Sequence, residues 1–117
     1  WGCQWDATLR WMQTSSNSEV ANFPTNSAGK GNYSGAQGDT NKVIPTGSNS
    51  AYAVNNIYDM AGNVIDRTIE AYNTNGRVGR GGYYGYAASD YPASLRTYSN
   101  PTDSFSSGGC RSTLYVK

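Results

Sequence analysis

Residues 57–72 read IYDMAGNVIDRTIEAY, and this stretch decides the fold because it is the most apolar part of the chain. It divides at the Ala-Gly-Asn sequence of residues 61–63. From residue 64 to residue 71 the side chains fall into two alternating sets, one mostly polar and one mostly apolar, which predicts a β-strand. Asn75-Gly76 predicts a hairpin turn. Residues 77–84 (RVGRGGYY) then predict a second, short strand that meets a glycine pair.

The chain before this hairpin is predicted to contain one helix and a long irregular segment. Trp5, Leu9 and Met12 recur at helical spacing, so residues 5–12 are expected to form an amphipathic helix with these side chains in the core. Residues 14–56 consist largely of Ser, Asn, Gly, Thr and Ala, with isolated apolar residues between them. We expect this segment to follow an irregular but ordered path.

The chain after the hairpin is predicted to be rich in loops. The adjacent glycines Gly81-Gly82 match neither a dinucleotide fingerprint nor a P-loop, and they indicate a bulge or a close backbone approach. Residues 85–109 carry tyrosines and turn signals, so we expect loops there. Residues 112–116 are expected to form a terminal strand.

The composition excludes several function classes. The chain has 117 residues, a formal net charge of +1 and no histidine, which is the size of a single domain, 1–117. Without histidine it has no Ser-His-Asp triad, Cys-His pair or histidine metal site. The charge provides no footprint for nucleic acid, and no apolar run approaches the roughly 18 residues of a membrane span. Cys3 and Cys110 either form one disulfide or lie buried as small apolar residues.

Three segments together resemble the formylglycine-generating-enzyme-like (sulfatase-modifying factor) family. Residues 57–64 (IYDMAGNV) resemble its LYDMxGNVWEW signature, residues 77–83 (RVGRGGY) its RVxRGGSW, and residues 109–111 (GCR) its closing GFR. The resemblance implies an α+β, C-type-lectin-like fold with much irregular loop structure. It also implies that the chain is the C-terminal part of a longer protein.

The same resemblance argues against catalysis. The enzymes of this family use two cysteines late in the chain, where this sequence has only Cys110. Their sulfoxide-forming relatives use a histidine-rich iron site, and this chain has no histidine. We therefore expect a protein that is not an enzyme, although an oxidoreductase of the formylglycine-generating type is kept as an alternative.

A subset of this family, the variable proteins of diversity-generating retroelements, is similar in a further set of residues. These are residues 80–85 (RGGYYG), residues 92–94 (PAS), Arg96, Pro101 and residues 114–117 (LYVK). In such proteins a reverse transcriptase rewrites adenines at the 3′ end of the gene. The resemblance implies that residues 77–117 form a variable ligand-binding region, displayed on a phage tail or a bacterial cell surface, with the cytoplasm left open.

The composition of this region provides an independent check. An asparagine codon AAC that is randomised at both adenines never encodes Lys, Glu, Gln, Trp or Met, and residues 78–116 contain none of these five. The alternative explanation is that loops rich in Gly, Ser and Tyr simply lack them. Tyr, Ser and Gly also dominate antibody paratopes, because tyrosine supplies a large amphipathic contact area at low entropic cost.

We expect a diverse, mainly protein ligand, with a carbohydrate-binding lectin as the alternative. Tyr84 is expected in the core, and Tyr83 is left open. Arg80 and Arg96 are expected to hold the loops by donating to backbone carbonyls. The exposed contact positions are predicted to be Gly79, Tyr86, Asp90, Tyr91, Leu95, Thr97, Tyr98, Asn100, Asp103, Phe105 and Ser107.

The family resemblance also implies a structural calcium ion. Its relatives hold calcium through oxygens that match Asp59, Gly62, Val64 and Asp66, two carboxylates and two carbonyls of the kind that a hard cation prefers. In the alternative, the Asp59 carboxylate caps the turn at residues 61–63, and Asp66 faces solvent or pairs with the neighbouring arginine.

Overall fold

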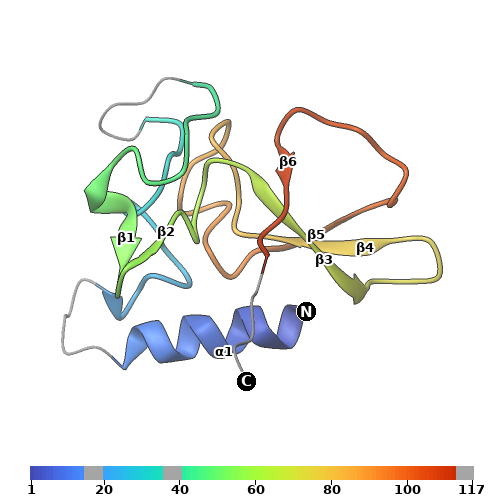
Figure 1. The fold of residues 1–117 in the computed structure, drawn as a ribbon, viewed down its shortest axis with the longest axis horizontal. Helices are drawn as coiled ribbons and strands as arrows, with labels where there is room; N and C mark the ends of the chain where they lie inside the picture. Colours follow the sequence, from blue (N-terminus) through green and yellow to red (C-terminus); the bar gives the residue numbers. More distant parts are fainter. Residues whose placement is uncertain (15–19, 36–40, 113–117) are drawn as a thin grey trace.

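The computed structural model describes residues 1–14, 20–35 and 41–112, which form one helix and two small sheets (Figure 1). A two-stranded sheet has the order β1-β2, and a four-stranded mixed sheet has the order β5-β4-β3-β6. The elements are α1 (Gly2–Gln13), the 3-10 helix η2 (Ser50–Tyr52), β1 (Ala53–Val54), β2 (Ile57–Tyr58), β3 (Ile65–Ala71), β4 (Arg77–Arg80), β5 (Arg96–Ser99) and β6 (Gly108–Gly109).

The predicted hairpin is confirmed and forms the centre of the larger sheet. Strands β3 and β4 are antiparallel, with Asp66 opposite Arg80 and a bulge further along the pair. The backbone N–H of Tyr72 donates to the carbonyl of Gly76 at 3.0 Å. The side chain of Asn73 accepts from the Gly76 N–H as well. The turn is therefore closed by the glycine that the sequence indicated.

The expectation that residues 85–109 contain only loops is wrong. β5 pairs antiparallel with β4, and β6 pairs parallel with β3. Both strands are short and lack an alternating apolar pattern, so their pairing depends on backbone hydrogen bonds to the hairpin rather than on side chains. The predicted terminal strand at 112–116 falls almost entirely outside the described residues.

Helix α1 begins three residues earlier than predicted, and it lies along one side of the molecule (Figure 1). Its buried residues are Gly2, Trp5, Leu9 and Met12, which confirms the predicted apolar face. In the added first turn, Gly2 packs closely against β3, since a Cβ there would overlap the Glu70 side chain. Within the parts of the chain that the structure describes, no helix is both long and apolar enough to span a membrane.

The core lies between α1 and the irregular segments. The indole N–H of Trp5 donates to the carbonyl of Ala93 at 2.9 Å, which connects the helix to the second half of the chain. The predicted irregular path contributes buried apolar side chains in its described parts. The buried apolar cluster consists of Trp5, Leu9, Met12, Val20, Phe23, Tyr33, Val54, Met60, Ala61, Ala88 and Ala93.

The Ala-Gly-Asn sequence at residues 61–63 holds the irregular segment in place. The amide oxygen of Asn63 accepts from the Asn32 side chain at 3.1 Å and from the Ile44 N–H at 3.0 Å. Its amide nitrogen donates to the Ile44 carbonyl at 3.0 Å. Gly62 pairs with Asn32 in a parallel bridge. Side-chain and backbone hydrogen bonds here replace the apolar contacts that this part of the sequence lacks.

Both expectations for the cysteines are wrong. Cys3 and Cys110 are free and exposed. Cys3 lies on the solvent side of α1, next to the buried Gly2, and Cys110 follows directly after β6.

Candidate ligand-binding surface

Four tyrosines in the loop after β4 form one aromatic group, which we call the tyrosine cluster: Tyr83, Tyr84, Tyr86 and Tyr91. Tyr86 and Tyr91 are stacked, with ring centroids 4.1 Å apart and an interplanar angle of 26°. Tyr83 meets both rings edge-on, at 5.2 Å from Tyr86 and 5.9 Å from Tyr91. Tyr84 meets Tyr83 edge-on at 5.7 Å. These are the offset and T-shaped arrangements that aromatic rings favour.

Backbone hydrogen bonds hold the tyrosine cluster on the body of the molecule. The Ser34 N–H donates to the Tyr86 carbonyl at 3.1 Å, and the Tyr84 N–H donates to the Asn63 carbonyl at 3.3 Å. Within the loop, the Tyr91 N–H donates to the Ala87 carbonyl at 3.0 Å. The loop is therefore anchored to the same Asn63 that fixes the irregular segment. Tyr84, expected in the core, is half-buried, as is Tyr83.

All of the predicted contact residues except Gly79 are exposed or half-buried. The prediction for Gly79 is wrong, because this residue lies in β4 between two side chains of the neighbouring strands. A Cβ added there would come within 2.5 Å of Ile65 and 3.1 Å of Thr97. Position 79 therefore packs inside the sheet.

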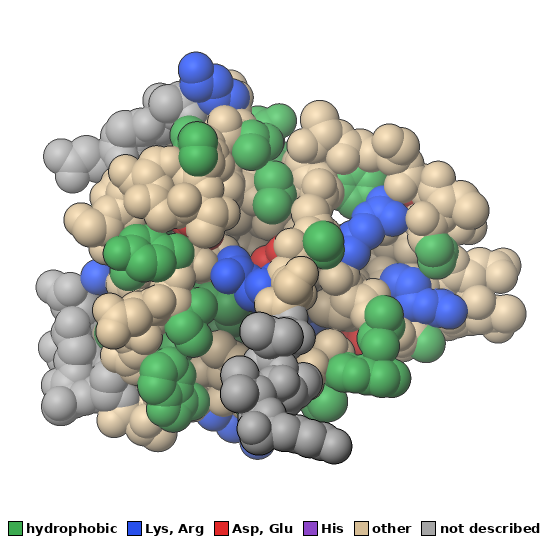
Figure 2. Space-filling view, viewed as in Figure 1, with side chains coloured by type: hydrophobic (Ala, Val, Ile, Leu, Met, Phe, Trp, Pro, Cys, Tyr) green, Lys and Arg blue, Asp and Glu red, His purple; other side chains and the backbone are tan. Residues whose placement is uncertain are grey.

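The structure divides the predicted contact residues into separate groups. Tyr86 and Tyr91 belong to the tyrosine cluster, and Asp90 lies between them in sequence. Tyr98 belongs to a second group, because its ring stacks on that of Tyr72 with centroids 4.2 Å apart. Tyr72 is 56 % exposed and was not predicted, because it precedes the variable region and only cross-strand packing brings it there. Figure 2 shows hydrophobic side chains in several separate patches on the face of the molecule that it draws.

A third group lies in the loop between β5 and β6, which Arg67 of β3 holds. Its guanidinium donates to the carbonyls of Asp103 at 2.6 Å and Pro101 at 3.2 Å. It also lies over the Phe105 ring, 4.5 Å from the centroid. In Figure 1 this loop extends on the side away from α1. Arg67 thus performs the role that was predicted for other arginines, and no signal in the sequence marked it.

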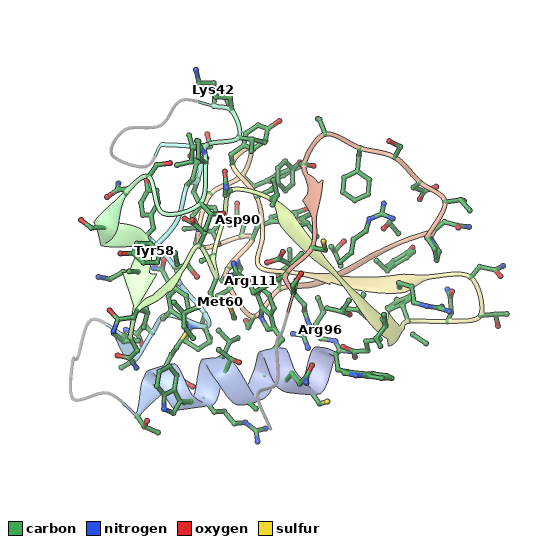
Figure 3. The ribbon with its side chains drawn as sticks, viewed as in Figure 1. Lys42, Tyr58, Met60, Asp90, Arg96 and Arg111 are labelled. Atoms are coloured by element: carbon green, nitrogen blue, oxygen red, sulfur yellow. The ribbon has the colours of Figure 1, made fainter. Side chains whose placement is uncertain are left out.

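The two arginines that were predicted to hold loops behave differently. Arg80 donates to the Ser94 carbonyl at 3.2 Å, as expected. The prediction for Arg96 is wrong, because its guanidinium pairs with the Glu70 carboxylate instead of a backbone carbonyl. Figure 3 shows Arg96 near the start of α1, where Glu70 also packs against Gly2.

Replacing Arg67 by alanine should release the loop of residues 100–105. We expect faster amide hydrogen exchange across that loop, and a loss of about 1–3 kcal/mol in the free energy of unfolding, because hydrogen bonds from a charged group are removed. Arg67→Lys should recover little of this, because an ammonium lacks the planar fork that reaches several carbonyls. The exposed Arg10→Ala on α1 is the control. Unchanged exchange in Arg67→Ala would contradict the assigned role.

Three of the four predicted calcium ligands line one cavity. Asp59, Val64 and Asp66 border a space of about 230 Å³, and Gly62 does not. The Arg111 guanidinium, visible in Figure 3, borders it too. It donates to the Asp59 carbonyl at 2.8 Å, and its Nε lies 3.5 Å from the Asp66 carboxylate.

The donor set does not fit the implied calcium site. Arg111 already supplies a positive charge between the two acidic residues, and the Asp59 carboxylate accepts from the Gly47 N–H at 3.0 Å. Among the described residues, no group of three or more His, Cys, Asp or Glu side chains is placed to hold a metal ion. Calcium therefore stays a prediction from the resemblance. The roles that the alternative gave to these two residues are wrong, because Asp66 is buried and faces Arg111, and the Asp59 carboxylate accepts from the Gly47 N–H.

Asp66 should make the stability depend on pH in an unusual direction. Burial raises the pKa of its carboxyl above the ordinary 3.8; the Arg111 guanidinium opposes this, and the Asp59 carboxylate adds to it. Because the folded protein holds the Asp66 proton more tightly than the unfolded chain does, the stabilisation from the protonated carboxyl is complete below pH 3.8. This stabilisation is lost as the pH rises through the pKa of Asp66 in the folded state. The free energy of unfolding of the wild type, minus that of Asp66→Asn, should therefore fall between pH 3.8 and neutral pH. Urea unfolding at a series of pH values measures it, and a rise would contradict the assignment.

Another cavity lies between α1 and β3, and none of the predicted contact residues lines it. It has a volume of about 570 Å³, and its lining includes Trp1, Trp5, Met60 and Ile69. Ile69 is 59 % exposed and points to solvent at this groove. The groove provides a reference surface against which binding at the tyrosine cluster can be tested.

Comparisons with known proteins add one structural similarity. No protein-family model matches the sequence, and no curated protein is significantly similar to it. The fold is similar to that of Treponema denticola variable protein 1, with a TM-score of 0.53 and 20% sequence identity, over 70% of this chain and 34% of that one. The chain thus spans about a third of the length of that structure. This likeness is one of fold, and it confirms a small α+β domain with one helix and a mixed sheet, built like a variable protein.

Proposed function

We propose that this chain is a non-enzymatic ligand-binding domain, a variable protein of a diversity-generating retroelement with the C-type-lectin-like fold of the formylglycine-generating-enzyme-like family. It binds diverse ligands, mainly proteins, through the tyrosine cluster and the neighbouring loops of residues 77–117. The observation that carries the proposal is the tyrosine cluster itself. It presents preorganised aromatic rings at the surface, inside residues 78–116, which lack Lys, Glu, Gln, Trp and Met.

The physical argument concerns the entropic cost of binding. A surface that accepts many ligands loses least when its contact residues are already ordered before binding. The edge-on and stacked contacts of Tyr83, Tyr86 and Tyr91 hold these rings in place. The backbone of the loop is held by the hydrogen bonds of Tyr86 with Ser34 and of Tyr84 with Asn63. A rigid scaffold beneath exposed loops is a common way to build a binding site.

The placement of the cysteines weighs against an enzyme of the formylglycine-generating type. That chemistry needs two cysteines that act together, and here both are free, one on α1 and one after β6. Binding of a glycan is the second candidate, because the stacked rings of Tyr86 and Tyr91 offer an apolar face to a sugar ring. The location on a phage tail or a bacterial cell surface belongs to the proposal on the strength of the resemblance.

Sister genes test the proposal most directly. We expect their differences to concentrate at positions such as Tyr86, Asp90, Tyr91 and Tyr98, in codons that contain adenine, and we expect a template repeat and a reverse transcriptase gene nearby. Differences spread evenly along the chain would overturn it.

A selection experiment tests the binding surface. One display library randomises the five residues of the tyrosine cluster and Asp90. A matched library randomises five residues that line the groove: Trp1, Gln4, Thr8, Thr68 and Ile69. Selection against a panel of unrelated proteins should yield binders from the first library far more often than from the second. Equal yields would contradict the assignment of the surface, and binders confined to glycan targets would favour the lectin.

A further inference from the structure

An acidic side chain lies beside the stacked tyrosines of the tyrosine cluster. Asp90 is exposed and lies directly before Tyr91, and its carboxylate accepts from the Ser89 hydroxyl at 3.2 Å. Burial raises the pKa of Tyr91, and the Tyr86 phenol and the Asp90 carboxylate raise it further. Burial and the neighbouring tyrosines likewise raise the pKa of Tyr83. None of these contributions comes from a positive group.

This combination of groups is complementary to a cation. The face of a tyrosine ring is negative and attracts an ammonium or guanidinium group within about 6 Å. Tyr86 is 42 % exposed, and Tyr91 packs against one side of it. The phenol oxygens and the Asp90 carboxylate carry lone pairs that accept hydrogen bonds from a cationic donor.

The same chemistry already occurs within this chain. The Arg67 guanidinium lies 4.5 Å from the centroid of the Phe105 ring while it donates to the backbone carbonyls of Pro101 and Asp103. A ring face next to acceptor oxygens therefore holds a guanidinium in one loop of the predicted variable region. The tyrosine cluster also offers a ring face and acceptor oxygens. No arginine of this chain is among the groups that shift the pKa of Tyr83 or Tyr91.

We propose that the tyrosine cluster together with Asp90 binds a positively charged side chain, arginine or lysine, of a protein ligand. This inference rests on the proposed function and names the chemistry of the group that the surface takes. The charge favours this ligand over a neutral sugar, because the hydroxyls of a sugar can donate to the carboxylate but carry no positive charge to pair with it. The stacked rings supply the contact area, and Asp90 supplies the selectivity for a cation.

Titration of the whole chain with small probes tests this inference. N-acetyl-arginine amide is added while the ring resonances of Tyr86 and Tyr91 are followed by NMR, with N-acetyl-norleucine amide as the uncharged control and methyl glucoside as the sugar. We expect saturable shifts with the arginine probe, which added salt should weaken, and no shifts with the other two probes. Asp90→Asn should weaken binding about threefold, Asp90→Glu should restore it, and Tyr86→Ala should abolish it. A thermal melt of each variant checks that it remains folded.

Other outcomes overturn the inference in distinguishable ways. Equal shifts with the norleucine and arginine probes would mean apolar binding without selection for charge. Shifts with methyl glucoside but not with the arginine probe would indicate a glycan site. No shift with any probe would refute binding at the tyrosine cluster. Selected protein binders that contact Tyr86 without using arginine or lysine would also overturn it and leave the proposed function standing. Uniform variation among sister genes would overturn the proposed function and leave the titration result intact.

Discussion

Replacing Arg80 by alanine should lower the free energy of unfolding by about 2–5 kcal/mol, the range for truncating a large buried side chain to alanine. Arg80 is 1% exposed and lies where α1 meets the sheet. Its Nη2 is 2.9 Å from the Asp6 carboxylate of α1 and 3.7 Å from the Glu70 carboxylate of β3. The substitution leaves Glu70 partly buried and opens a cavity of the size of the lost side chain.

The expected loss is large relative to the stability of an ordinary domain, about 5–15 kcal/mol in total. Urea unfolding followed by tryptophan fluorescence measures it, because Trp5 lies in the core that α1 forms. Arg77→Ala is the matched control in the same strand, since its guanidinium donates to the adjacent Gly76 carbonyl. We expect the control to lose less than about 1 kcal/mol. Equal losses in the two variants would show that the Arg80 network does not join the helix to the sheet.

Replacing Gly82 by alanine should destabilise the fold by about 2–4 kcal/mol and displace the tyrosine cluster. Gly82 has a φ of +70°, a backbone conformation that residues other than glycine rarely adopt. A Cβ added there would lie 2.0 Å from the Tyr91 carbonyl oxygen. Because backbone rather than a flexible side chain is in the way, the loop must move. Tyr91 would then lose its stacking on Tyr86.

Gly47→Ala separates the two causes of this effect. Gly47 has a φ of +81°, but nothing lies within 4 Å of an added Cβ, so the control carries only the cost of the left-handed backbone, about 1–2 kcal/mol. The difference between the two variants therefore measures the close approach of Gly82 to Tyr91. We expect the ring signals of Tyr86 and Tyr91 to shift in Gly82→Ala and to stay unchanged in Gly47→Ala. Unchanged ring signals in both would contradict the role of Gly82.

Local patterns in the sequence predicted the elements that depend on local physics. The alternation from residue 64 to residue 71 and the Asn75-Gly76 turn predicted the β3–β4 hairpin, and the spacing of Trp5, Leu9 and Met12 predicted α1. The glycine pair was interpreted as a bulge or a close backbone approach, and the contact of Gly82 with Tyr91 shows the close approach. β5 and β6 were missed, because two to four residues without an apolar pattern become strands only when another strand offers its backbone.

The candidate site was predicted in composition but not in arrangement. Exposure of the tyrosines in the second half of the chain followed from the resemblance, and Tyr86 and Tyr98 are exposed. Their division into separate groups was not predictable, because Tyr98 meets Tyr72 across two strands. The buried place of Gly79 depends on Ile65 and Thr97, which are distant in sequence.

The sequence by itself determined that this chain has no histidine chemistry, one amphipathic helix, one central hairpin and a tyrosine-rich second half. Only the tertiary structure decided which charges meet. Arg67 holds the loop of residues 100–105, Arg80 joins α1 to the sheet, and Arg111 lies between Asp59 and Asp66. The physical reason is the range of the interactions: turn and periodicity signals act over a few residues, whereas an arginine finds its acceptors across the fold and leaves no local pattern.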